Sequence, residues 1–314
     1  MIDQAVPPAD TETVVAALRD DLARGDAVAG TVAPILRHLV AAGDVSVFSE
    51  EILARVRAML ADLAIALLDA LVGTESRRVH SAGEVEVVGR ALLDNPALLT
   101  HLHSLALEWQ LTERMQARLA LDPVMSPLLQ GLLPNDQGLA AAFVGAQARW
   151  CQAQRQMKLA LRELPAELLN VALYTLRMLA GAEPELAARA TVAETEIRAS
   201  YDEASSRMGL AAKLVAGLGD GAWTALVLAR AGVPLFLTAI AQGSGQNRDA
   251  VVLSTHEAQI ARLALALRAA GLEPWLVEEQ ILALHSEMLL PEGFERIGSE
   301  QAATILSLHP GQPA

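Results

Sequence analysis

Residues 49–73 read SEEILARVRAMLADLAIALLDALVG, and this stretch sets the expectation for the whole fold. Its apolar residues recur with the period of an α-helix and not with the strict alternation of a strand. Ser49 and Glu50 form a helix start signal, and Gly73 is a helix stop signal. The sequence therefore predicts one long helix from Ser49 to Val72.

The same helical period continues along nearly the whole chain, and no stretch shows convincing two-residue alternation. Helix start signals recur at Asn95-Pro96, Asp122-Pro123, Asp136, Leu164-Pro165, the capping-box pattern Ser254-Thr255-His256-Glu257, and Glu273-Pro274. Gly181 and Gly271 predict helix ends, and a helix is expected from Ala140 to Lys158. We therefore expect an all-α protein, arranged as an irregular HEAT-like α-solenoid or a stacked helical-hairpin array.

Composition excludes several classes of protein. The chain has 314 residues, of which 53% are hydrophobic, 19% charged and 3% aromatic, which is too apolar for a disordered protein. The net charge of −13 argues against binding to duplex nucleic acid or to an anionic membrane. The lone Cys151 and an N-terminus without the features of a secretory signal predict a cytoplasmic protein.

Two regions bear on domains and membranes. The turn Gly181–Pro184 suggests an N-terminal helical array, 1–181, and a C-terminal array, 182–314, either separate from the first or continuous with it. Residues 222–241 are long enough for a membrane span, but they contain Arg230, and Gly232 and Pro234 interrupt the run. We expect two buried helices there and no stable membrane insertion.

No constellation of polar residues predicts an enzyme, a cofactor or a metal site. His101 and His103 are two residues apart, so on a helix they point in different directions, and they are expected at the surface or at caps. Asp62 and Asp69 share a polar stripe with Arg55, which is typical of a solvent-facing side of a helix.

The remaining motifs also favour structural roles. His256-Glu257 lacks the second histidine of a zinc-protease motif, because position 260 is Ile. The glycines of 217–221 follow an apolar helical pattern and predict a helix cap and a hinge, not a phosphate loop. Cys151 has basic neighbours that could lower its pKa, but no histidine lies near it in the sequence.

The best functional signal is a basic segment, residues 149–162. It contains Arg149, Arg155, Lys158 and Arg162 and no acidic residue, whereas residues 1–95 and 181–314 each carry a net charge of −7. Arg155, Lys158 and Arg162 share one face if the helix continues through them. Trp150 is a candidate anchor within the segment, and Trp275 is a second candidate for an exposed anchor.

A family resemblance rests on the C-terminal third. Residues 233–241 (VPLFLTAIA), 244–249 (SGQNRD) and 261–272 (ARLALALRAAGL) resemble the C-terminal part of an uncharacterised bacterial family, and residues 95–181 resemble it more loosely. The resemblance implies an all-helical, HEAT-like, cytoplasmic protein of unknown function, and it assigns no catalytic residues.

These observations favour a soluble protein-interaction adaptor or regulator. Its helical groove would bind a protein partner, and the basic segment would select an acidic or phosphorylated surface. Small-molecule or lipid binding in an apolar pocket between helices is the alternative. The sequence leaves the oligomeric state open.

Overall fold

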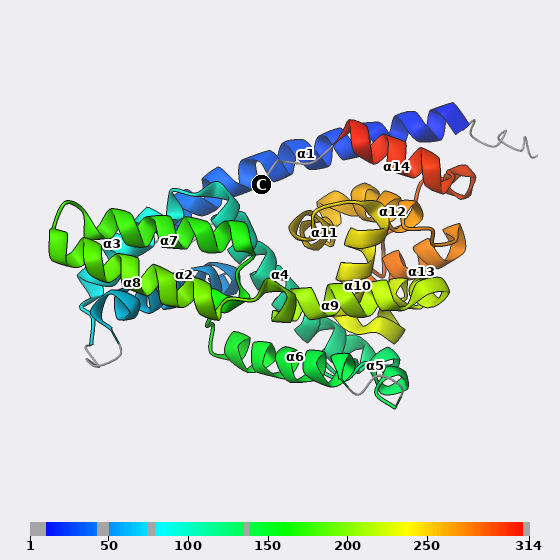
Figure 1. Ribbon diagram of the computed structural model, residues 1–314. Coiled ribbons are helices and arrows are strands. Elements are labelled where there is room, and N and C mark those ends of the chain that lie inside the picture. The colour runs from blue at the N-terminus through cyan, green and yellow to red at the C-terminus, as the bar shows by residue number, and fades with distance from the viewer. Residues whose placement is uncertain (1–10, 43–49, 74–78, 135–137, 310–314) are drawn as a thin grey trace, which may run out of the picture. The chain divides into compact units, whose positions relative to one another are not determined.

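The computed structural model describes residues 11–42, 50–73, 79–134 and 138–309, and all regular elements in these ranges are helices (Figure 1). The prediction of an all-α protein is confirmed. By their contacts the described residues form two compact units, one within residues 1–32, 111–137 and 212–313 and the other within 33–110 and 138–211. Three helices have residues in both units: α1 (Thr11–Ala42), α4 (Pro96–Leu119) and α9 (Arg207–Gly217).

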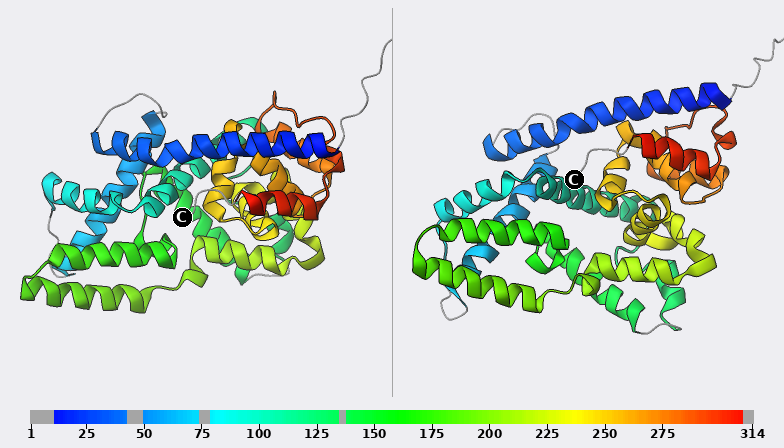
Figure 2. Two further views of the ribbon diagram at one scale, coloured as in Figure 1. Left: turned by 90° about the horizontal axis from the view of Figure 1, so that it is seen from above. Right: turned by 45° about the horizontal axis from the view of Figure 1, so that its top comes forward.

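The unit formed by residues 33–110 and 138–211, hereafter the second unit, is organised around α2 (Glu50–Val72). This helix packs against α3, α7 and α8, and α7 and α8 lie side by side as a helical hairpin (Figures 1 and 2). Its remaining elements are α3 (Ala82–Leu93), α6 (Leu139–Arg155), η1 (Leu161–Glu163), α7 (Ala166–Ala180), α8 (Pro184–Ser200) and η2 (Glu203–Ser205).

The other unit, hereafter the first unit, is organised around α10 (Leu228–Ser244), which is buried along most of its length. It contacts α12, which in turn packs along α14 (Figure 1). Its remaining elements are α5 (Pro127–Leu132), η3 (Gly219–Leu226), α11 (Arg248–Ser254), η4 (Glu257–Gln259), α12 (Ile260–Ala269), α13 (Pro274–Leu284), η5 (Phe294–Arg296) and α14 (Ser299–Leu308).

The apolar run at residues 222–241 is mostly buried, as expected. Gly232 has φ 70° and ψ 165°, so it interrupts α10 as the sequence predicts, and a second break separates α10 from η3. Among the described residues, no single helix has the length and hydropathy of a membrane span. Taken together, η3 and α10 have that length and hydropathy, but a bend of 105° separates them.

Several helix boundaries follow the local signals. Gly73 ends α2 with φ 79°, and Gly181 ends α7 with φ 58°. The Asn95 side chain accepts a hydrogen bond of 2.9 Å from the backbone N–H of Leu98 at the start of α4. Asp136, which was expected to cap α6, lies outside the described residues. The boundary predicted near residue 181 falls at the turn between α7 and α8, which both belong to the second unit, and the division into 1–181 and 182–314 stays a prediction.

Two predicted helix starts are wrong. Asp122 accepts hydrogen bonds from the backbone of Val124 and Met125 and forms a turn, and α5 begins only after Ser126, whose hydroxyl caps it. Ser254 does not open a capping box, because it is the last residue of α11 and its hydroxyl donates to the carbonyl of Val251.

Candidate partner-binding site

The helix that carries the basic segment stops earlier than the sequence predicts. α6 ends at Arg155, where the N–H groups of Gln156 and Lys158 both bond to the carbonyl of Ala153 at 3.0 and 2.9 Å. Met157 then adopts a left-handed φ of 55°. Lys158 and Arg162 therefore lie outside α6, and the expectation that they share one helical face with Arg155 is wrong.

The four basic side chains of the segment are all exposed. Arg162 comes within 4.0 Å of the carboxylate of its neighbour Glu163, which is the limit for an ion pair. Arg149, Arg155 and Lys158 form no ion pair with any residue in the described ranges. Their charge is therefore directed at solvent in a chain whose net charge is −13.

The turn after α6 is held in place by buried contacts with α2. The Asp62 carboxylate accepts a hydrogen bond of 3.0 Å from the N–H of Leu159, and Arg55 donates to the backbone carbonyl of Gln154. The Gln154 amide donates to the carbonyl of Lys158 at 3.2 Å. Because Leu159 and Gln154 are buried, these contacts fix the backbone that carries Arg155 and Lys158.

Trp150 does not lie on this exposed surface. It is 4% exposed, so the prediction that it is a surface anchor is wrong. Trp150 lies on the side of α6 that faces the interior of the second unit. The Arg207 guanidinium lies 4.1 Å from the centre of the Trp150 ring, and the Trp109 ring meets Trp150 edge-on at 5.8 Å. Trp150 is therefore a packing residue of the cluster described next.

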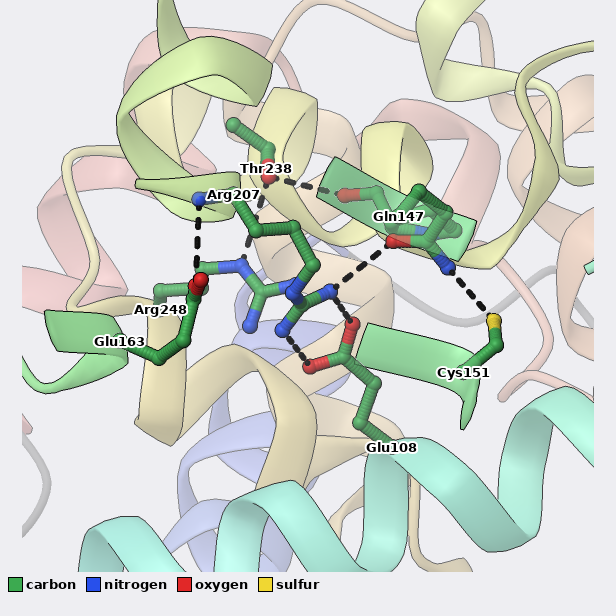
Figure 3. Close-up of polar contacts among 8 residues, drawn as sticks. Glu108, Gln147, Cys151, Glu163, Arg207, Thr238 and Arg248 are labelled. Carbon is green, nitrogen blue, oxygen red and sulfur yellow. Dashed lines mark hydrogen bonds and ion pairs between the residues drawn. The ribbon is translucent and has the colours of Figure 1, made fainter. Parts of the chain in front are cut away.

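A buried ion pair connects α4 with α9 in the second unit. Arg207 donates two hydrogen bonds to the carboxylate of Glu108, at 2.7 and 3.1 Å, and approaches the amide oxygen of Gln147 at 3.5 Å (Figure 3). Arg207 is 2% exposed and Glu108 is fully buried. The two hydrogen bonds to one carboxylate have the geometry that offsets the cost of burying charge, and they join the Arg207 side chain to that of Glu108 on α4.

Cys151 adjoins this pair but is not an activated nucleophile. Burial raises the pKa of its thiol to about 11, and the positive charges of Arg207 and Arg155 only partly oppose that shift. The thiol is therefore neutral at physiological pH, and the Gln147 amide approaches its sulfur at 3.5 Å (Figure 3). Cys151 is therefore a buried, neutral packing residue beside the ion pair.

The polar residues weighed as catalytic or metal-binding candidates are dispersed. His101 and His103 are buried, at 1% and 5% exposure, which corrects the expectation of surface histidines. Arg55 is also buried and lies 5.4 Å from the centre of the Trp109 ring, so its part of the α2 stripe is not a solvent face, whereas Asp69 is exposed. Across the described ranges, no three His, Cys, Asp or Glu residues cluster as metal ligands would.

Sequence reasoning missed the Glu108–Arg207 pair because its members are 99 residues apart. The only local signal was a carboxylate within an apolar stretch of α4, which does not identify a partner. The exposed basic residues, by contrast, could be identified from the sequence, because residues 149–162 contain four of them and no acidic residue.

Comparison with known proteins gives no relative: no family model, no curated protein and no solved structure matches this chain. The resemblance to an uncharacterised helical family therefore stays a prediction.

Proposed function

We propose that this protein is a cytoplasmic interaction adaptor or regulator, built as an irregular HEAT-like or helical-hairpin array, and that its basic segment binds an acidic or phosphorylated surface of a partner protein. One observation carries the proposal: exposed Arg149, Arg155 and Lys158 have no counter-ion among the described residues. Unpaired, exposed cations are free to pair with carboxylates or phosphates of another molecule.

The turn after α6, which contacts with α2 hold in one conformation, strengthens this proposal. Arg155 ends a regular helix, and Lys158 follows in a turn whose backbone is bonded to Asp62 and Gln154. A backbone held in one conformation loses little entropy when the side chains bind, which raises affinity. The neighbouring hairpin of α7 and α8 is the element that favours the helical-hairpin array over other all-α arrangements.

The test begins with partners isolated by cross-linking and native pull-down from the source cells. For each partner, the affinity of the double variant Arg155→Glu/Arg162→Glu is compared with wild type by calorimetry. We expect a loss of about tenfold or more, because the variant replaces attraction with repulsion at two positions.

A matched control separates this effect from the change in net charge. Arg19 and Lys213 are exposed and form no ion pair with the described residues, so Arg19→Glu/Lys213→Glu changes the charge equally. The control should bind within about twofold of wild type. Equal losses in both variants, or no loss in either, would overturn the assignment of the basic segment.

A further inference from the structure

Tryptophan and arginine side chains pair repeatedly in this protein. Three of its four tryptophans have a guanidinium over the ring, at distances from 4.1 to 5.7 Å: Trp109 with Arg55, Trp150 with Arg207, and Trp223 with Arg230. Trp275 is the fourth tryptophan. It is 64% exposed, and no arginine of the described residues lies over its ring.

Trp275 lies on a face of α13 that has no partner in the chain described. Glu278, Glu279 and Leu282 follow it at three, four and seven residues, so the four side chains share one side of the helix, and all are exposed. We call these four residues the α13 face. Neither Glu278 nor Glu279 forms an ion pair with a described residue.

The charged residues in the sequence around the α13 face are all acidic. Between Arg268 and Arg296 there are six glutamates and no lysine or arginine. The α13 face thus combines an exposed aromatic ring with two neighbouring unpaired carboxylates. An arginine side chain satisfies both features, because its planar guanidinium stacks on the ring while its N–H groups bond to carboxylates.

Exposed arginines without a counter-ion are present in the chain itself, in the basic segment. We propose that the α13 face of one copy binds the basic segment of a second copy, with Arg155 over Trp275 and paired to Glu278 and Glu279. This inference rests on the proposed function, since it names one partner for the basic segment. The two surfaces share no residue, so the contact is heterologous and each copy can bind a further one.

The net charge of −13 opposes self-association at long range, but the contact joins a local excess of positive charge to a local excess of negative charge. At about 0.1 M salt the screening length is roughly 10 Å, so repulsion between distant charges is largely screened while the contacting pairs are not. Association is therefore expected near physiological salt and should weaken at several-fold higher salt.

The test is sedimentation of the full chain across a wide concentration range. Wild type should show an average mass that rises with concentration. Trp275→Ala and Glu278→Arg/Glu279→Arg should each weaken the association about tenfold or more. Arg155→Lys/Arg162→Lys, which keeps the charge but loses the planar group, should also weaken it measurably.

Two controls make the result specific. Trp223→Ala removes another partly exposed tryptophan, and Glu12→Arg/Glu196→Arg reverses two exposed glutamates elsewhere, so both should associate as wild type does. Arg155→Glu/Arg162→Glu and Glu278→Arg/Glu279→Arg should each be monomeric alone and associate when mixed, because the mixture restores opposite charges at both contacts.

A monomer mass at every concentration up to about 1 mM would overturn the inference, as would association that the α13 variants leave unchanged. A different result would contradict the proposed function, so the two proposals can be tested separately. If wild type is monomeric but a separate partner still loses affinity in Arg155→Glu/Arg162→Glu, only the self-association is wrong.

Discussion

At the scale of single residues, the Arg207–Glu108 pair makes the strongest prediction. Arg207→Met removes a positive charge and two hydrogen bonds from the fully buried carboxylate of Glu108, and we expect a loss of about 3–5 kcal/mol in the free energy of unfolding. Glu108→Leu/Arg207→Met removes both charges and should recover most of that loss. Urea unfolding of the three proteins measures this.

An exposed ion pair provides the comparison. Glu185→Gln removes the partner of Arg189 one turn along α8, where both side chains are exposed, and should cost about 0.5 kcal/mol or less. If Arg207→Met costs no more than Glu185→Gln, or if the double variant is as unstable as the single one, the Arg207–Glu108 pair does not stabilise the fold as its burial implies.

His285 makes the stability of the first unit depend on pH. Burial lowers the pKa of His285, Arg114 adds to that shift, and the hydrogen bond to the carbonyl of Thr255 at 2.8 Å opposes it. The folded protein therefore binds this proton less tightly than the unfolded chain does. Stability is fully present above about pH 6.5 and falls as the pH is lowered, by at most about 1.4 kcal/mol per pH unit.

Denaturant unfolding between about pH 7.5 and 5.5 checks the His285 prediction. His285→Gln should be less stable at neutral pH, since it disturbs a buried hydrogen bond, but it should lose less stability on acidification than wild type. The exposed His38 provides the control, and His38→Gln should keep the wild-type pH dependence. Equal slopes for wild type and His285→Gln would contradict the prediction.

At the scale of elements, the break within α10 depends on Gly232. Its φ of 70° is unfavourable for other residues, and an added Cβ would lie 3.1 Å from the Cβ of Ser126. Gly232→Ala should therefore destabilise the protein by more than about 1 kcal/mol. Gly83→Ala, in an open position of helix α3, should be neutral or stabilising by up to about 1 kcal/mol. Thermal unfolding distinguishes the two, and equal effects would refute the role of φ.

Helices with local boundary signals were predictable, and those bounded by distant contacts were not. α2, α4, α7 and α13 begin or end at Gly or Pro signals that act on their own backbone. The end of α6 has no such signal: Met157 takes a left-handed φ in a turn that Arg55 and Asp62 hold from α2. The same limit applies to the candidate site: the sequence shows its basic residues, but the helical face predicted to carry Arg155, Lys158 and Arg162 does not form, because α6 ends at Arg155.

At the scale of the whole molecule, neither compact unit is a continuous stretch of sequence. The first unit needs residues from α1: the Gln259 amide donates to the carbonyl of Gly25 at 2.6 Å, and Arg262 pairs with Asp26 at 2.6 Å. Arg262 is 4% exposed, so without Asp26 it would be a buried cation that lacks its carboxylate.

Cutting the chain at residue 181 therefore predicts a specific outcome. The fragment 1–181 lacks α8 and Arg207, which removes the Arg207–Glu108 ion pair, and the fragment 182–314 lacks Asp26 and α5, which contacts α10. Each fragment alone should show little cooperative unfolding by calorimetry, because each loses a partner of a buried charge as well as apolar contacts. Coexpressed, the two should associate and regain a cooperative transition.

If either fragment alone unfolds cooperatively with a stability close to that of the intact chain, then the division at residue 181 describes independent domains, and the ion pairs that cross it contribute little to stability.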